Sequence, residues 1–569
     1  MGNRARAAFA GIAGLILAFG LAELVHGIYD GVPSVFASLA QGIIELTPGS
    51  FATRAIELLG TADIPILIAS MIVGAVVVIA IIANVRLRSA MLALLAVVIL
   101  AVVAIAAVLT QPAVVAVPTV LTIAGALALG VVVAEAIMRR SNLVGTSDTA
   151  EPGANPTLEQ SSQPARSSAS MAGIRRKDAH SDRGIQVNRG AFLALSGGAA
   201  AVGLALIGAG RFLSSSGASE AASQPLQLGG GSGGETTGAE PSNAEAEVTN
   251  ETLPPVPDDT KLAVVQEVTP LITPASDFYL IDAALTSPQV NRETWSLKVD
   301  GAGVTNPLDL SYDDLLSMST REVDVTLSCV SNEVGGGLVS NARWTGVMLS
   351  DVLNEAGLTR ESLGATNRQL VGRSVDGWTG GFDSDIAFDG REAILAFGMN
   401  GNELPVKHGY PVRLVVPGLY GYVSATKWLQ EIELTDWDFD AYWIRRTWTK
   451  EGPVKTQSRI DTVSADSDLS AGTIPVGGVA WAPHRSVSMV EVSTDGGESW
   501  NEARLAAQLS DDTWRQYSYD WDAPAGEHTL QVRATDGEGK TQTSTERGPH
   551  GGGGTDGATG YHSINVVVA

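Results

Sequence analysis

One cysteine has the surroundings of a metal ligand. Cys329 stands where a β-like run, residues 323–327, gives way to a turn with three consecutive glycines at 335–337. A strand end of this kind can present a thiolate, which is a soft metal ligand, and glycines let backbone approach a bulky group. The alternative is that Cys329 is a small buried apolar residue.

A second set of groups is basic. His408, Arg413 and Lys427 lie among Gly- and Pro-rich turns within residues 400–429. Side-chain donors at fixed angles and exposed backbone N–H groups favour an anionic, phosphate-bearing ligand. A phosphate-bearing cofactor held near a soft metal on Cys329 would account for both sets of residues.

Composition excludes several other kinds of site. A single cysteine in 569 residues cannot form an intrachain disulfide or a cysteine-built zinc or iron–sulfur site. The 61 acidic and 37 basic residues argue against nucleic-acid binding, which depends on Lys and Arg neutralising phosphates.

The chain has two halves of different character. Residues 1–213 hold 14 Lys/Arg and 11 Asp/Glu, whereas residues 214–569 hold 23 and 50. The first half also has four stretches that are apolar over the about 20 residues a helix needs to cross a bilayer, at 64–83, 90–109, 113–138 and 191–212. A fifth stretch, 7–28, is long enough but carries Glu23 and His26. We therefore expect an all-α membrane region, 1–213, with about five transmembrane helices, and an external or interfacial amphipathic segment at 31–59.

Basic residues predict the orientation of this region. Groups of Lys and Arg at 4–6, 86–88 and 139–189 all fall on the cytoplasmic side if five helices span the membrane. Everything after residue 213 then lies outside the cytoplasm. Glu23, His26 and Glu135 could form a proton or haem path, or they could be structural residues at helix ends. A lone His26 cannot supply paired axial haem ligands, so we expect the helices to serve as an anchor.

The last apolar stretch has a distinctive start. Residues 188–195 resemble the beginning of a twin-arginine export signal, although only Arg189 of the two arginines is present. The alternative is an ordinary basic flank of a membrane helix.

The acidic half divides into three. Residues 214–260 are rich in Gly, Ser, Ala and acidic residues and predict a disordered tether, as do residues 141–187 in the first half. Strand and helix patterns interleave irregularly over 261–452, which favours an α+β domain. Alternating strands and turns over 453–569 favour an all-β immunoglobulin-like sandwich, in which Trp481, Trp500, Trp514 and Trp521 belong to the core or form a ligand platform.

Several spaced motifs together resemble the sulfite oxidase family of molybdopterin enzymes. They are residues 277–279, the Cys329 segment, and residues 341–347, 399–418 and 427–429. Residues 490–500, 532–536 and 561–564 are similar to the dimerisation domain that follows in many members. The resemblance covers residues 262–569 and leaves out the membrane half.

The resemblance implies roles for particular residues. Cys329 would be the catalytic protein thiolate on molybdenum. The molybdenum–molybdopterin cofactor would be held by Tyr279, Asp376, His408, Arg413, Ala425, Thr426 and Lys427, with Cys329 as the metal ligand.

The sequence departs from the family pattern where substrate would bind. Glu333 and Val334 occupy the places of two arginines, Leu280 replaces a third, and Trp378 stands near the place of the expected tyrosine. A sulfite dianion would meet a carboxylate if Glu333 points inward, which is unfavourable. Replacement cations could come from Arg343, Arg373, Arg445 or Arg446, each of which could instead be a surface or ion-pair residue. We therefore add Trp378 and Arg373 to Cys329 as catalytic candidates.

These residues predict a membrane-anchored, extracytoplasmic molybdopterin oxidoreductase that performs two-electron oxygen-atom transfer, sulfite oxidase-like but with altered substrate-site arginines. One alternative is a sulfoxide or N-oxide reductase on the same scaffold, and another is a non-catalytic cell-surface binding protein. Expected partners are the membrane, a separate electron carrier such as a cytochrome, cupredoxin or quinone-linked protein, and a second copy of the chain bound through the C-terminal domain.

Overall fold

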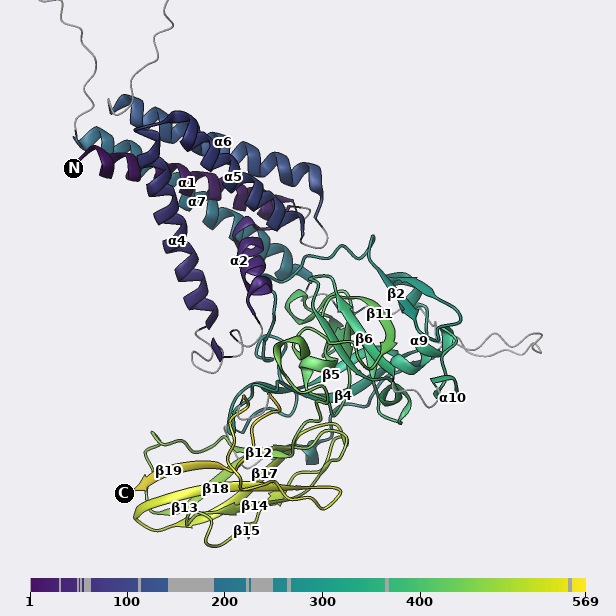
Figure 1. The fold of residues 1–569 in the computed structure, drawn as a ribbon. Helices are drawn as coiled ribbons and strands as arrows, with labels where there is room; N and C mark the ends of the chain where they lie inside the picture. Colours follow the sequence, from purple (N-terminus) through teal and green to yellow (C-terminus); the bar gives the residue numbers. More distant parts are fainter. Residues whose placement is uncertain are drawn as a thin grey trace, which may run out of the picture. The chain divides into compact units, whose positions relative to one another are not determined.

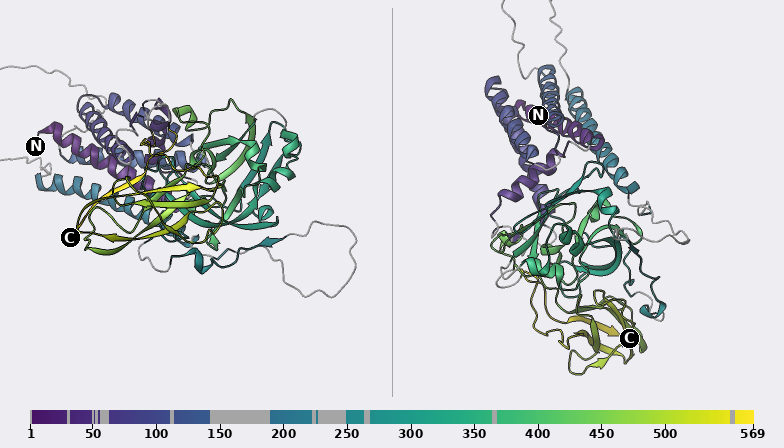
Figure 2. Two further views of the ribbon diagram at one scale, coloured as in Figure 1. Left: turned by 90° about the horizontal axis from the view of Figure 1, so that it is seen from below. Right: turned by 90° about the vertical axis from the view of Figure 1, so that its right-hand side faces the viewer.

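The computed structural model describes most of the chain and divides it into two units (Figures 1 and 2). The described residues are 2–29, 32–48, 51, 54–55, 63–110, 114–141, 189–221, 225–226, 249–262, 268–363, 368–550 and 555–569. One unit is helical and comes from the N-terminal part of the chain. The other is larger, rich in β-structure, and contains all the candidate site residues.

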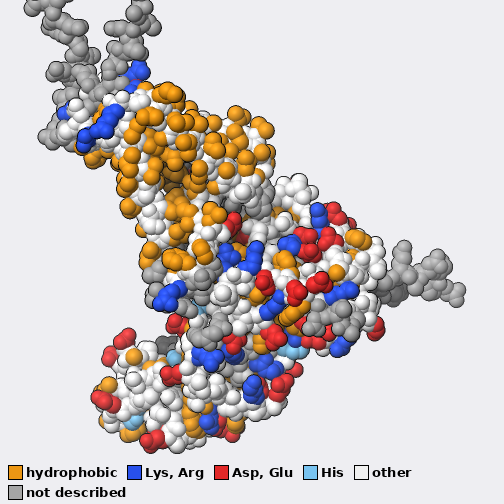
Figure 3. All heavy atoms as spheres, in the orientation of Figure 1, with side chains coloured by type: hydrophobic (Ala, Val, Ile, Leu, Met, Phe, Trp, Pro, Cys, Tyr) orange, Lys and Arg blue, Asp and Glu red, His pale blue; other side chains and the backbone are white. Residues whose placement is uncertain are grey.

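Five helices are long and apolar enough to cross a membrane: α1 (Asn3–Ile28), α4 (Asp63–Arg86), α5 (Ala90–Leu109), α6 (Ala116–Arg140) and α7 (Arg189–Ala221). They coincide with the five stretches expected from the sequence. Hydrophobic side chains cover the visible face of this region (Figure 3). A shorter apolar helix, α2 (Val35–Leu46), lies within the segment expected to be external or interfacial.

Small residues allow close packing between these helices. A Cβ built on Gly14 of α1 would lie 2.4 Å from the carbonyl oxygen of Gly130 in α6, and one on Gly20 would lie 2.3 Å from that of Gly203 in α7. Glycine pairs of this kind let helix backbones approach where lipid provides no hydrophobic driving force.

Glu23, His26 and Glu135 each have a local partner. Ser34 donates to Glu23 (2.7 Å), His26 Nδ1 bonds to the carbonyl of Val32 (2.8 Å), and Glu135 pairs with Arg86 (2.6 Å) and Arg139 (3.0 Å). These contacts favour the structural interpretation of Glu23, His26 and Glu135 over a proton or haem path.

Two mixed sheets build the α+β domain. The first has the order β1-β4-β5-β8-β10, with β9 paired to β8, and the second has the order β3-β2-β11-β6-β7. The strands of the first are β1 (Asn250–Glu251), β4 (Thr320–Ser328), β5 (Val339–Met348), β8 (Ile394–Met399), β9 (Asn402–Glu403) and β10 (Arg413–Val415). Those of the second are β2 (Ser296–Gly301), β3 (Leu308–Ser311), β6 (Arg368–Ser374), β7 (Thr379–Asp383) and β11 (Leu429–Asp436).

Short helices connect these strands. They are α8 (Tyr312–Leu316), α9 (Leu349–Glu355), α10 (Arg360–Leu363) and α11 (Gly421–Ser424). Buried apolar residues from both sheets form a common core that includes Leu297, Phe397 and Leu414. The irregular alternation of strand and helix agrees with the α+β class expected from the sequence.

The predicted tether, 214–260, is wrong at both ends. Helix α7 continues to Ala221, and strand β1 pairs in parallel with β4, with Asn250 opposite Thr320. The backbone N–H of Leu253 donates to Glu322 (2.8 Å). Composition misses this because a short strand added to a sheet edge is stabilised by backbone hydrogen bonds rather than by large apolar side chains. Residues 227–248 and the predicted disordered loop, from residue 142, lie outside the described residues.

Two four-stranded sheets make up the C-terminal domain, with the orders β12-β13-β17-β16 and β15-β14-β18-β19. The strands are β12 (Gln457–Ile460), β13 (Gly472–Trp481), β14 (Val487–Ser493), β15 (Asn501–Glu502), β16 (Arg504–Leu505), β17 (Arg515–Ala523), β18 (Gly526–Asp536) and β19 (His562–Val568). Trp521 is buried in the core of this domain, whereas Trp481 and Trp514 are buried in the core that includes Leu297 and Phe397. Trp500 is half-buried, with the guanidinium of Arg533 4.2 Å from the centre of its ring. The immunoglobulin type of this domain remains a prediction.

Candidate active site

Cys329 follows the last residue of β4 and begins a closed loop. Its backbone N–H donates to the carbonyl of Leu338 (2.9 Å), and its own carbonyl accepts from Asn332 (3.0 Å). The side chain is 9% exposed. Burial raises the pKa of the Cys329 thiol above its ordinary value, while hydrogen bonds with Ser331 lower it. The loop therefore presents a buried sulfur at a strand end, as the sequence predicts.

A glycine brings the basic residues together. Gly409 has φ of +114°, and a Cβ there would lie 3.0 Å from the Cβ atoms of both Arg413 and Lys427. Arg413, the first residue of β10, donates from Nη1 to the carbonyl of His408 (3.1 Å). The turn at Gly409 thus packs the stems of His408, Arg413 and Lys427 into one cluster.

Arg413 is buried and forms no ion pair within the described residues. Its side chain is 4% exposed, its guanidinium lies 5.0 Å from the centre of the Trp344 ring, and Nε has no hydrogen-bond partner. Burial lowers the pKa of Arg413 to about 10. The hydroxyl of Thr426 is also buried and unpartnered. Buried polar groups are nearly always hydrogen-bonded, so these donors fit an anionic ligand that completes the site.

His408 is neutral and structural rather than a cationic donor. Its Nε2 lies 2.8 Å from the carbonyl oxygen of Ala275, which can only accept, so Nε2 carries the proton and Nδ1 retains a lone pair. Burial, together with the nearby charges of Arg413 and Lys427, lowers the pKa of His408 to about 4, although the hydrogen bond to Ala275 raises it. The residue therefore links the basic cluster to the segment that precedes Tyr279.

Tyr279 lies between Ser340 and Gly421. Its backbone N–H donates to Ser340 Oγ (3.1 Å), and its hydroxyl lies near Gly421, which also contacts Ala425. Burial raises the pKa of Tyr279, the Cys329 thiolate raises it further, and Arg413 opposes both. The phenol thus lies within electrostatic reach of both predicted groups.

Sequence reasoning missed an acidic member of the site, Asp282. It forms an ion pair with Lys427, whose ammonium also donates to the carbonyl of Lys407 (3.0 Å). Burial raises the pKa of Asp376, as does Asp282, while Lys427 lowers it. The position of Asp282, three residues after Tyr279 in the same segment, was the available signal.

The remaining candidates differ in their contacts. Asp376 accepts from the backbone N–H of Trp378 (2.9 Å), and the indole of Trp378 packs against Gly380. Arg373 instead forms an ion pair with Glu433 and lies 5.3 Å from the centre of the Phe439 ring. Its contacts therefore give no support to the predicted catalytic role of Arg373, because its charge is already paired.

The other proposed replacement cations also have structural contacts or face solvent. Arg343 makes a two-point ion pair with Asp324 (2.8 and 2.9 Å), Arg446 donates to the carbonyl of Tyr442 (2.9 Å), and Arg445 is exposed. Glu333 is exposed as well. No contact in the described part of the chain brings these arginines to Cys329.

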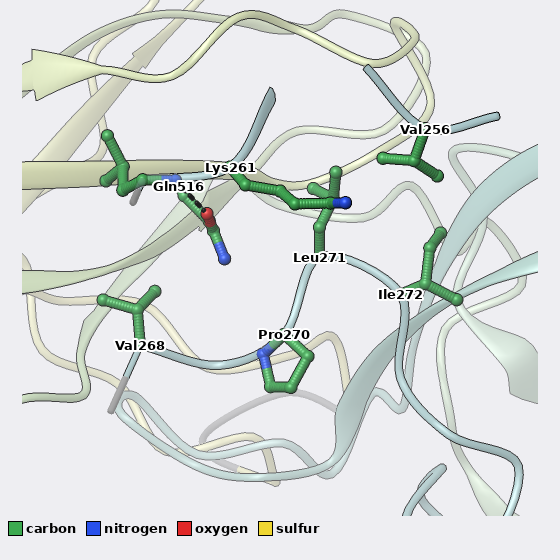
Figure 4. Close-up of a pocket in the computed structure, with 8 residues that line it drawn as sticks. Val256, Lys261, Val268, Pro270, Leu271, Ile272 and Gln516 are labelled. Atoms are coloured by element: carbon green, nitrogen blue, oxygen red, sulfur yellow. Dashed lines mark hydrogen bonds between the residues drawn. The ribbon is translucent and has the colours of Figure 1, made fainter. Parts of the chain in front are cut away.

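A cavity of about 380 Å³ lies elsewhere in the same unit (Figure 4). It is lined by Val256, Lys261, Leu262, Val268, Pro270, Leu271, Ile272 and Gln516. None of the predicted site residues lines it, so it is separate from the candidate active site.

Comparisons with known proteins find a matching family and several relatives. The family described as oxidoreductase molybdopterin binding domain matches residues 284–443. Human mitochondrial sulfite oxidase is 31% identical over 304 residues, covering 46% of this chain and 55% of that protein. Spinach nitrate reductase [NADH] is 27% identical over 275 residues, covering 39% and 29%. The chain thus spans little more than half the length of the first of these relatives.

A solved structure is similar over a larger part of the chain. The sulfane dehydrogenase SoxCD from Paracoccus pantotrophus is 24% identical, with a TM-score of 0.43, and the match covers 56% of this chain and 88% of that one.

Proposed function

We propose that this chain, a molybdenum-cofactor oxidoreductase that binds molybdenum–molybdopterin, is a membrane-anchored enzyme that catalyses two-electron oxygen-atom transfer outside the cytoplasm. The observation that carries the proposal is Arg413, a buried guanidinium whose Nε lacks a partner and which lies beside the segment of Tyr279. Burying such a charged group lowers the stability of the fold unless an anionic ligand pairs with it.

Different residues of the site would bind different parts of this cofactor. Cys329 would ligate the metal as a thiolate. Arg413, Lys427 and the hydroxyl of Thr426 would hold the pterin and its phosphate, with the backbone at Ala425, while Tyr279 and Asp376 line the same site. When bound, the cofactor supplies the two-electron redox chemistry, and the protein contributes binding, orientation and electrostatics.

Charge around the thiol supports a substrate other than sulfite. Glu333, Val334 and Leu280 stand where the family pattern has arginines, and Arg343 and Arg373 are held in ion pairs with Asp324 and Glu433. A dianion would gain little attraction here. A neutral sulfoxide or N-oxide suits the site better: with two electrons and two protons it yields the reduced compound and water.

Metal analysis with a substrate panel tests this proposal. We expect the purified full chain in detergent to contain about one molybdenum per chain, to reduce dimethyl sulfoxide or trimethylamine N-oxide with a reduced artificial electron carrier, and to oxidise sulfite poorly. Absence of molybdenum from cofactor-replete protein would refute the enzyme assignment. Rapid sulfite oxidation would instead refute only the altered substrate preference.

Basic residues at helix ends support the proposed orientation. Arg4 and Arg6 lie at the start of α1, Arg86 ends α4, and Arg140 ends α6, and with five crossings these ends share the cytoplasmic side. We expect protease added outside intact spheroplasts to cleave the C-terminal domain and to spare the loop between α6 and α7. Protection of the C-terminal domain would reverse the orientation.

Electrons would pass to or from a separate carrier, such as a cytochrome, cupredoxin or quinone-linked protein. Among the described residues, no group of three or more His, Cys, Asp or Glu side chains is arranged to hold a metal ion. Export by the twin-arginine route and a homodimer through the C-terminal domain remain predictions.

A further inference from the structure

Two side chains of the C-terminal domain contact the glycine-rich loop behind Cys329. Arg459 of β12 donates from Nη1 to the carbonyl oxygen of Gly336 (2.8 Å). The imidazole of His562, the first residue of β19, lies against Gly335, where a Cβ would stand 2.3 Å from its Cδ2 atom. Gly335 also has φ of +76°, so a side chain there would be both strained and blocked.

The loop has internal hydrogen bonds as well, one of them from the N–H of Gly336 to the carbonyl of Glu333 (2.9 Å). Hydrogen bonds close its base, where Cys329 bonds to Leu338, and the side chain of Asn332 accepts from the N–H of Leu338 (2.8 Å). Three consecutive glycines follow, and glycine populates more backbone conformations than other residues. Contacts from the C-terminal domain therefore add to the loop's own hydrogen bonds at Gly335 and Gly336.

Arg459 holds the loop and the Tyr279 segment together. Its Nη2 donates to Thr269 Oγ1 (2.7 Å) and its Nε to Asp461 Oδ1 (2.6 Å), while Asp461 Oδ2 accepts from the N–H of Thr269 (3.1 Å). Thr269 lies ten residues ahead of Tyr279 in the chain. One guanidinium thus joins the Cys329 loop to the segment that leads to Tyr279 through charge-assisted hydrogen bonds.

His562 is held in one orientation. Its Nδ1 accepts from the backbone N–H of Ile460 (3.0 Å), so its proton is on Nε2. Burial keeps the pKa of His562 below its ordinary value, the charge of Arg459 lowers it further, and Asp461 raises it. The imidazole ring is therefore neutral and packs against Gly335 in a fixed orientation.

We propose that Arg459 and His562 are positioning residues that set the geometry of the Cys329 loop, so that the C-terminal domain is part of the catalytic unit. The proposal rests on the proposed function, because it takes Cys329 as the metal ligand. It assigns to the C-terminal domain a role distinct from dimerisation.

The test uses the molybdenum-loaded full chain and the variants Arg459→Lys and His562→Asn. Lysine keeps the charge, but its single ammonium cannot hydrogen-bond to Gly336, Thr269 and Asp461 at once, as the planar guanidinium of arginine does. Asparagine keeps an acceptor for the Ile460 N–H but removes the ring from Gly335. We expect both variants to retain molybdenum, to show a displaced Mo(V) electron paramagnetic resonance spectrum, and to lose about tenfold or more in turnover.

Arg533→Lys is the matched control, because Arg533 lies in the same domain and makes a comparable two-point pair with Glu491 (2.7 and 3.0 Å). It should leave the spectrum unchanged. A wild-type Mo(V) spectrum in folded, loaded Arg459→Lys and His562→Asn would overturn the proposal. If Arg459→Lys fails to fold, His562→Asn alone decides. Lack of molybdenum in the wild-type chain would instead refute the proposed function.

Discussion

Replacing Cys329 with serine should reduce bound molybdenum and lower turnover by more than about a hundredfold. A thiolate is a soft ligand that ionises readily when a metal binds, whereas a serine hydroxyl stays protonated and is a harder donor. Molybdenum per chain, measured by elemental analysis together with the Mo(V) resonance spectrum, checks this result.

Cys329→Ala separates ligation from folding. The site is buried, so serine introduces a hydroxyl that costs about 1–3 kcal/mol if it finds no partner. Alanine avoids that cost but equally lacks a ligand. Both variants should therefore lose the metal, while alanine unfolds closer to the wild-type temperature. Full metal content and activity in Cys329→Ser would remove the basis of the assignment.

Replacing Arg413 with methionine should abolish cofactor binding without destabilising the cofactor-free chain. Methionine preserves much of the volume over Trp344 and removes a buried charge whose Nε has no partner. Methionine avoids the desolvation cost of a buried charge that has no ion-pair partner among the described residues, so the change should be neutral or stabilising. The readouts are bound pterin, measured by fluorescence after oxidative release, and the thermal midpoint of the cofactor-free chain.

Arg343→Met provides the contrast. Arg343 pairs with Asp324, whose side chain is almost fully buried. Removing Arg343 leaves this carboxylate buried without a counterion, which should lower the free energy of unfolding by about 3–5 kcal/mol. Pterin content per folded chain should stay at the wild-type level. A cofactor-free Arg413→Met chain that unfolds as early as Arg343→Met would show that Arg413 is a structural residue.

Local sequence patterns could predict much of this protein. The β-like run at 323–327 and the turn after it placed Cys329 correctly at the end of β4 (Thr320–Ser328). The apolar stretches located five helices because length and hydropathy are local properties. The cluster of His408, Arg413 and Lys427 was also accessible, since its members share turns that are close in sequence.

Long-range pairing was not accessible in this way. The sequence alone allowed Arg373 to contact substrate. Its ion pair with Glu433 forms only because β6 pairs with β11 in the folded chain. The pairing of Asp282 with Lys427 likewise depends on how distant segments fold together. A charged residue's role depends on which opposite charge lies next to it, and periodicity carries no information about that.

The outer edge of β4 is covered along its length. Residues 249–253 bond to its first half, through Thr249 to Thr320 and Leu253 to Glu322. The C-terminal domain bonds to its second half, where Ser510 donates to the carbonyl of Asp324 (3.1 Å) and Asp512 accepts from the N–H of Thr326 (3.0 Å). An open strand edge is a template for pairing with other molecules. The strand that leads to Cys329 therefore offers no open edge, among the described residues, for pairing with another chain.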